Sequence, residues 1–240
     1  MQIVEIDHID ATAEPFDWTF PQEYREEIEA YWQKEAANRI GFFNGTVLIQ
    51  HRGEVEGRVF RAGYSATEYK HFLGFLRLPH LSPGIRNGFG MAALRARDGA
   101  FLLGEMGPNT ANAGRIYFAA GTPDLGDIRD GRVDLASSVL REMEEETGLK
   151  ASEVVAQNSW TAFLLEKRVA FMRDVFIDLP AEEARRLMLD RMKNLHEEEL
   201  SDIVIIRPGD PLPYDADDPF DRSRMPSFVA EYMKREFARR

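Results

Sequence analysis

The segment REMEEETGLK, residues 141–150, carries four glutamates and closes on a glycine and an aliphatic residue. On a helix that turns about 100° per residue, Glu142, Glu145 and Glu146 share one side, whereas Glu144 points elsewhere. Like charges at these spacings repel, and the C-terminal turn is the unfavourable end of a helix for anions. A solvated charged face is one interpretation of this helix. A bound divalent cation is the other, because it would compensate both penalties.

The helix that carries these glutamates has recognisable ends. LASSVLREMEEETG follows Asp134, a residue type that favours the N-cap, and ends at Gly148, a residue type that favours the position after a helix. We therefore predict a helix over 135–148. Before it, RIYFAAG at 115–121 has the composition of a strand, and a polar loop, GTPDLGDIRDGRV, joins the two.

With the strand that ends at Gly121, the run from Arg141 to Leu149 resembles the Nudix box. The second half of that box is Arg-Glu, an aliphatic residue, any residue, Glu-Glu, any residue, Gly and an aliphatic residue, and every specified position matches. The resemblance in layout covers about residues 88–208. It implies an α/β fold, a Nudix-type α/β/α sandwich with a mixed sheet. It also implies Mg²⁺- or Mn²⁺-dependent hydrolysis of a nucleoside diphosphate linked to another group, X.

The resemblance assigns roles to named side chains. Glu142, Glu145 and Glu146 would hold one or more cations, which neutralise the pyrophosphate and lower the pKa of the attacking water. Arg141 would orient the carboxylates and the loop, and the Gly121 region would contact the metal or approach the phosphate closely. Nudix enzymes often take a further ligand or general base from the region before the last strand. Here His196-Glu197-Glu198-Glu199 occupies it, and Glu198 is the central choice, with a solvated loop as the alternative.

The first half of the box departs from the family. The pattern would place a glutamate at position 133, which is Val133, and a glycine at position 127, which is Asp127. Gly121 can serve as that glycine only if the loop is longer than in the family. Asp134, Asp130 or Asp127 could replace the missing glutamate, and spacing does not choose among them.

The remainder of the chain predicts a smaller N-terminal α+β part over 1–87, a Nudix domain over 88–208, and a tail with a short helix over 209–240. Helical patterns cover 21–39 and 67–78, and strand patterns cover 46–50 and 58–62. The segment 78–90 is rich in Pro, Gly and Asn and is predicted as an irregular joint between the N-terminal part and the main domain. A hairpin is expected around Asp98-Gly99. The order Trp32, FFNG and YKHFLG resembles the N-terminal region of a Nudix branch that cleaves UDP-sugars.

Composition limits the functions that are open. The net charge of −11 disfavours nucleic-acid binding, and the absence of cysteine excludes disulfides and thiolate metal sites. No signal peptide or membrane-spanning window is found, so we expect a cytoplasmic protein that acts on a small nucleotide. UDP-sugar, ADP-ribose, coenzyme A and dinucleoside polyphosphates are alternatives for X. The protein could form a homodimer. An alternative to the enzyme is a noncatalytic Nudix-fold module that binds a nucleotide or a partner.

Overall fold

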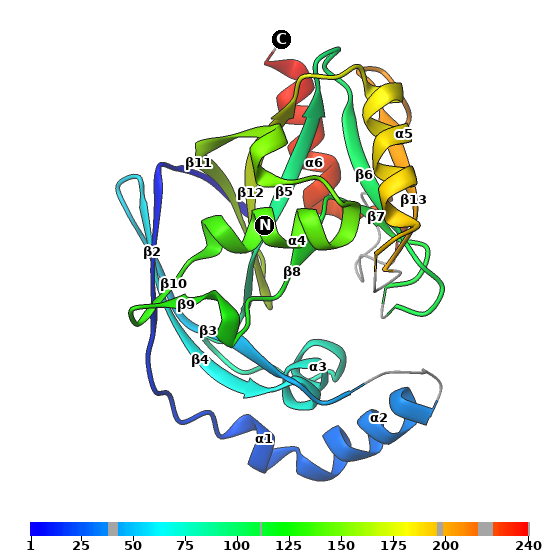
Figure 1. Ribbon diagram of the computed structural model, residues 1–240. Helices are drawn as coiled ribbons and strands as arrows, with labels where there is room; N and C mark the ends of the chain where they lie inside the picture. Colours follow the sequence, from blue (N-terminus) through cyan, green and yellow to red (C-terminus); the bar gives the residue numbers. More distant parts are fainter. Residues whose placement is uncertain (38–42, 111, 196–198, 216–222, 240) are drawn as a thin grey trace. The chain divides into compact units, whose positions relative to one another are not determined.

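The computed structural model describes residues 1–37, 43–110, 112–195, 199–215 and 223–239 (Figure 1). The chain divides into two compact units. The first comprises residues 1–89, 122–135 and 162–170, and the second comprises residues 90–121, 136–161 and 171–240. This grouping does not test whether segments fold independently, so the predicted boundaries at 87/88 and 208/209 stay a prediction.

The strands of the first unit are β1 (Gln2–Ile6), β2 (His8–Ala13), β3 (Thr46–Glu56), β4 (Val59–Glu68), β9 (Ile128–Arg129) and β10 (Arg132–Val133). Five of them form a mixed sheet in the order β3-β4-β2-β10-β9. β3 and β4 are the antiparallel pair predicted at 46–50 and 58–62, and both are longer than predicted. The turn between them has a φ of +61° at Gly57, a conformation that favours glycine. β2 runs parallel to β4.

The helices of the first unit are α1 (Phe20–Glu23), α2 (Arg25–Ala37), α3 (Tyr69–Arg77) and the 3₁₀ helix η1 (Leu125–Asp127). The helix predicted over 21–39 is therefore two helices that meet at Tyr24, and its last two residues lie outside the described part. α1, α2 and α3 share one hydrophobic core, made of Trp18, Phe20, Ile28, Ile49, Phe72, Phe75 and Ile85. Lys167 closes the end of α3, because its Nζ donates to the carbonyls of Phe75 and Leu78 at 2.7 and 2.9 Å.

The second unit is built around a sheet with the order β11-β12-β5-β6-β13. Its strands are β5 (Asn87–Ala96), β6 (Phe101–Met106), β7 (Ile116–Tyr117), β8 (Ala120–Gly121), β11 (Val154–Leu164), β12 (Arg168–Ile177) and β13 (Leu200–Ile206). Its helices are α4 (Leu135–Thr147), η2 (Ala151–Glu153), α5 (Ala181–Met192) and α6 (Ser227–Ala238). Every residue of β5 is buried, as expected for a strand covered on both faces.

Two consecutive residues of β12 show that helices cover both faces of this sheet. Arg173 and Asp174 point to opposite faces because side chains alternate along a strand. The Arg173 Nη1 donates to the Ala136 carbonyl of α4 at 2.8 Å, and the Asp174 Oδ1 accepts from the Tyr232 hydroxyl of α6 at 2.5 Å. α4 and α6 therefore lie on opposite sides of the sheet (Figure 1). The predicted α/β class and α/β/α sandwich are confirmed.

Two local predictions need correction. The strand predicted over 115–121 is two short strands, because β7 pairs with β6 and β8 pairs with β5, so the chain changes partner between them. The segment 78–90, predicted as an irregular joint, ends inside β5. The hairpin around Asp98-Gly99 is confirmed, with a φ of +88° at Gly99.

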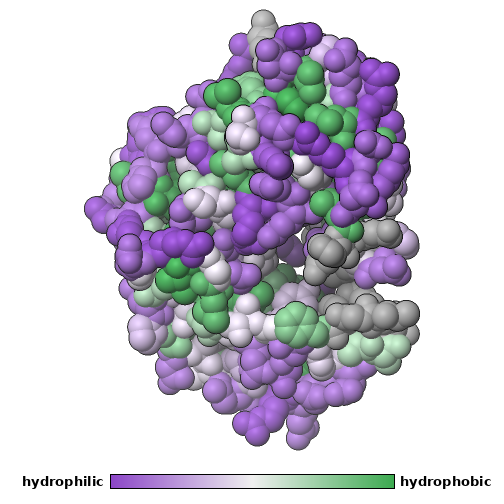
Figure 2. Space-filling view, viewed as in Figure 1, coloured by the Kyte–Doolittle hydropathy of each residue, from purple (hydrophilic) through white to green (hydrophobic). Residues whose placement is uncertain are grey.

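Within the described ranges, no helix is long and apolar enough to cross a membrane. Hydrophilic residues cover most of the face shown in Figure 2, and hydrophobic residues lie among them in small groups. This surface agrees with a chain in which 30% of the residues are charged.

Candidate functional site

Helix α4 is held in place by one apolar face and a defined end. Leu135, Val139 and Met143 recur at helical spacing and are all buried. The helix stops at Gly148, which has a φ of +72° and whose N–H donates to the Glu144 carbonyl at 2.8 Å. A β-carbon at Gly148 would also lie 2.7 Å from the Arg191 Cβ, so both backbone conformation and space require glycine. The predicted end of the helix is confirmed.

The three glutamates that share a side of α4, Glu142, Glu145 and Glu146, are named here the acidic edge. Their surroundings differ: the side chain of Glu142 is 16% exposed and that of Glu145 56%, whereas Glu146 is 5% exposed. Arg141 bridges the first two, with its Nη2 2.8 Å from Glu142 Oε1 and its Nη1 2.7 Å from Glu145 Oε2. The guanidinium thus offsets the repulsion expected between neighbouring carboxylates.

Glu146 is the buried member of the acidic edge. Its Oε1 accepts a hydrogen bond from the Ala120 N–H at 3.3 Å, and its Oε2 is buried without a hydrogen-bond partner. Burial raises the pKa of Glu146 well above its usual value, and the charges of Glu199, Glu142 and Glu145 raise it further, against the Ala120 hydrogen bond. A buried carboxylate oxygen without a partner destabilises the fold, and a cation is one kind of partner that would relieve this cost.

Gly121 lies against the acidic edge. A β-carbon at this position would lie 2.1 Å from the carboxylate carbon of Glu142 and within 2.3 Å of both its oxygens. A larger residue here would displace the Glu142 carboxylate, so glycine allows the backbone and this carboxylate to approach each other. The predicted contact of Gly121 with a metal or a phosphate stays a prediction.

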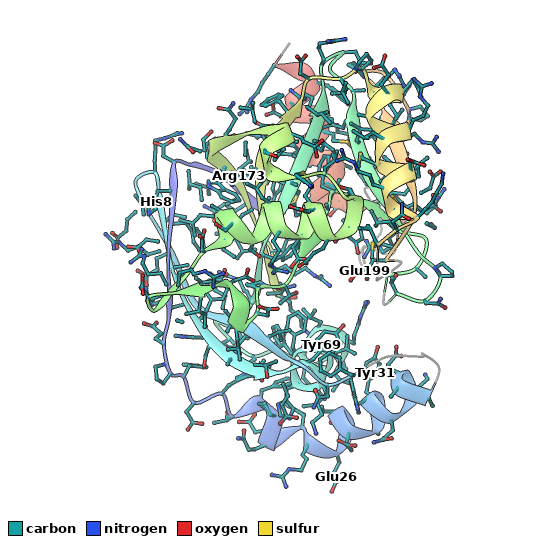
Figure 3. The ribbon with its side chains drawn as sticks, in the orientation of Figure 1. His8, Glu26, Tyr31, Tyr69, Arg173 and Glu199 are labelled. Atoms are coloured by element: carbon teal, nitrogen blue, oxygen red, sulfur yellow. The ribbon has the colours of Figure 1, made fainter. Side chains whose placement is uncertain are left out.

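The additional carboxylate was predicted at Glu198, which lies outside the described residues. The next residue, Glu199, directly precedes β13, and its carbonyl accepts from the Gly107 N–H at 2.7 Å. After burial, its charge is the largest influence on the pKa of Glu146, and Figure 3 shows it near the C-terminal part of α4. The sequence signal for Glu199 is its position directly before Leu200, the first apolar residue of the last strand.

The lengthened loop between Gly121 and α4 belongs to the first unit. It forms the hairpin of β9 and β10, which extends the sheet next to β2, and the turn at Asp130-Gly131 has φ values of +50° and +75°. Val133 is buried in β10 opposite Ile128. The extra residues are thus used to add strands to a sheet, and the position of the missing glutamate is a core position.

The three aspartates considered as replacements lie in this loop in different settings. Asp127 is buried, and its Oδ2 accepts from the Asp124 N–H at 3.0 Å. Asp130 is exposed in the turn, and the Asp134 N–H donates to the Asp127 carbonyl at 2.9 Å. Which of them replaces the glutamate stays a prediction.

The acidic edge suits a divalent cation in donor chemistry, because it offers carboxylate oxygens, one of them buried and without a partner. Over the described ranges, no three His, Asp or Glu side chains are already gathered as a complete metal-binding group. The ion pairs of Arg141 give a physical reason, because they direct the carboxylates of Glu142 and Glu145 toward the guanidinium. Glu146 is the member whose unpartnered oxygen fits a cation.

No protein-family model matches the sequence, and no curated protein matches it. Among solved structures, the chain is similar to the Nudix hydrolase RenU from M. smegmatis, with 16% identity over 62% of this chain and 83% of that one, at a TM-score of 0.38. It is similar to a MutT protein from Methanosarcina mazei Go1, with 17% identity over 64% and 94%, at a TM-score of 0.39. It is also similar to DR0079 from Deinococcus radiodurans, with 14% identity over 68% and 84%, at a TM-score of 0.40. The case for an activity rests on this chain's own side chains.

Proposed function

We propose that this protein is a metal-dependent pyrophosphohydrolase that cleaves the pyrophosphate bond of a nucleoside diphosphate linked to another group, X. The observation that supports it most is the Glu146 carboxylate, buried beside two other glutamates with its Oε2 unpartnered. A noncatalytic fold has no need to keep such a group, because glutamine would fill the same space without the charge.

Each residue of the site has a role in this proposal. Glu142, Glu145 and Glu146 hold Mg²⁺ or Mn²⁺, which when bound would neutralise the pyrophosphate and acidify the attacking water. The Ala120 N–H fixes the Glu146 carboxylate through Oε1 and leaves Oε2 for the cation. Arg141 positions Glu142 and Glu145 through two ion pairs, and at least one of these must weaken when a cation binds.

The proton of the attacking water needs an acceptor, and Glu199 carries a carboxylate whose charge acts on Glu146 of the acidic edge. We assign this role to Glu199 or its neighbour Glu198. Glu199 is the better supported of the two, because its charge acts on Glu146. A carboxylate can accept the proton of the attacking water in a general-base step.

A nucleotide sugar is the first form of X to test, because the segment from Trp32 to Gly74 resembles the UDP-sugar-cleaving branch. ADP-ribose, coenzyme A and dinucleoside polyphosphates belong in the same panel. Phosphate release is measured after a phosphatase step, with Mg²⁺ and with Mn²⁺. Turnover of at least one compound is expected, and its absence across the panel with both metals would contradict the proposal.

Two variants on α4 make the test specific to the acidic edge. Glu146→Gln keeps the shape of the side chain and removes its charge, and we expect turnover to fall by at least about a hundredfold. Glu144→Gln is the matched control, because Glu144 is exposed on another side of the same helix. Full activity of Glu146→Gln would contradict the assignment. Nucleotide binding without turnover in the wild type would instead support a noncatalytic binding module, which Val133 in place of the box glutamate favours.

A further inference from the structure

The proposed function leaves one phenol of the second unit, that of Tyr117, without a role. Tyr117 is in β7, just upstream of Ala120, whose N–H holds the Glu146 carboxylate. The backbone of Tyr117 is fixed by the ladder with β6, where it pairs with Gly104. Burial raises the pKa of Tyr117, and the nearby charges of Glu146 and Glu199 raise it as well. The phenol therefore stays protonated at neutral pH and is a hydrogen-bond donor.

The hydrogen bonds of this phenol leave its proton available. The Tyr117 hydroxyl oxygen accepts from Asn112 Nδ2 at 3.2 Å. Its own O–H group has no acceptor among the residues that the structure describes. On the other side, the Glu146 Oε2 is a buried acceptor without a donor, and the two groups do not hydrogen-bond to each other. An unused donor and an unused acceptor thus belong to the same part of the second unit, because the charge of Glu146 acts on Tyr117 and Ala120, three residues after Tyr117, donates to Glu146.

One kind of ligand satisfies both groups at once. A divalent cation supplies the positive partner that Glu146 Oε2 lacks, and an anionic oxygen bound to that cation supplies an acceptor for the phenol. A phosphate carries oxygens for both contacts, since some can bind the cation while another accepts a hydrogen bond. A free anion would be repelled by the glutamates, so the cation and the phosphate must arrive together.

We propose that Tyr117 is a substrate-contacting residue that donates a hydrogen bond to a phosphate oxygen of the cation-bound pyrophosphate. Asn112 positions it, because the Nδ2–H donated to the phenol oxygen restricts the hydroxyl proton to directions away from Asn112. This inference rests on the proposed function for its substrate class, but its contact concerns binding and does not require cleavage.

The test separates cation binding from phosphate binding in the full-length protein. Mn²⁺ affinity is measured by electron paramagnetic resonance of free Mn²⁺, and affinity for inorganic pyrophosphate is measured by calorimetry on the Mn²⁺-loaded protein. Tyr117→Phe removes only the hydroxyl. Tyr24→Phe, in the first unit, is the matched control. Thermal unfolding of both variants checks that the fold is intact.

We expect Tyr117→Phe to bind Mn²⁺ as the wild type does and to bind pyrophosphate about tenfold more weakly, which is the size of one hydrogen bond to a charged acceptor. Unchanged pyrophosphate affinity would overturn the proposal. An equal loss of Mn²⁺ affinity would also overturn it, because the phenol would then act through the carboxylates. If the wild type binds Mn²⁺ and pyrophosphate but cleaves no nucleotide, the proposed function fails while the Tyr117 contact stands. If the wild type binds no pyrophosphate with Mn²⁺ present, the Tyr117 contact is overturned.

Discussion

Two glutamates of the second unit are equally buried but have different partners. Glu236 of α6 is 7% exposed, and it lies 3.8 Å from Arg95 Nη2 and 2.6 Å from Arg239 Nη1. Glu146 of α4 is 5% exposed and receives one backbone hydrogen bond, with the other oxygen unpartnered. A buried charge is normally paired within the chain, as Glu236 is. This difference agrees with the proposal that a cation is the partner of Glu146.

The largest effect is expected when the paired glutamate, Glu236, loses its charge. Glu236→Gln should lower the free energy of unfolding by about 3 kcal/mol, because the buried Arg95 loses its carboxylate partner. Urea denaturation measures this change. Glu231→Gln, on the same helix, should change stability far less. An unchanged free energy of unfolding in Glu236→Gln would show that the ion pair does not stabilise the fold. Glu236 would then not serve as the paired glutamate with which Glu146 is compared.

The next effect concerns the external partner of Glu146. Mg²⁺ or Mn²⁺ should stabilise the wild type by about 2.7 kcal/mol at a hundredfold excess over its dissociation constant. Glu146→Gln should lose most of this gain, and Glu144→Gln should keep it. Thermal unfolding with and without the cation measures both. A full cation shift in Glu146→Gln would show that the cation binds elsewhere.

A smaller effect of opposite sign to that at Glu236 is expected without divalent cations. Glu146→Gln should raise the free energy of unfolding by about 1 kcal/mol near neutral pH, because it removes a desolvated charge and keeps the hydrogen bond from Ala120. Urea denaturation in a chelator measures it. Destabilisation of this variant would mean that the carboxylate already has a stabilising partner.

The pH dependence of stability follows from the same group. The pKa of Glu146 is raised in the folded protein above its ordinary value, mainly by burial, so the folded state binds this proton more tightly than the unfolded state. The stability due to that proton is fully present below about pH 4.5 and is lost as the pH rises through the folded pKa. Wild-type stability without cations should therefore fall toward neutral pH, and Glu146→Gln should lack this component.

The smallest effect is expected at an ion pair on the surface. The hydrogen bond from Arg191 lowers the pKa of Glu153 to about 2, so this pair stabilises above about pH 4.5 and its contribution is lost as the pH falls through about 2. Both side chains are about one-third exposed, and Glu153→Gln should cost only about 0.5 kcal/mol near neutral pH. Urea denaturation measures the loss. Glu183→Gln on α5 is the control. An equal loss of stability in that variant would contradict a stabilising role for the Arg191–Glu153 ion pair.

Local patterns predicted much of the second unit. The helix over 135–148 and the hairpin at Asp98-Gly99 were read from periodicity and turn residues, and both are present. These features depend on spacings of a few residues, which a sequence displays directly. The split of 115–121 into β7 and β8 was not predictable, because it depends on which distant strands each half pairs with.

The sequence by itself determined which carboxylates share the edge of α4, because helical geometry depends only on spacing: Glu142, Glu145 and Glu146 lie together, and Glu144 lies elsewhere. Only the tertiary structure decided that Glu146 is buried with an unpartnered oxygen while Glu145 is exposed. Burial depends on what packs over a helix face, and here that includes Ala120 from a distant strand. The position of Glu199 was likewise fixed by the pairing of β13 with β6, a contact between segments far apart in the chain.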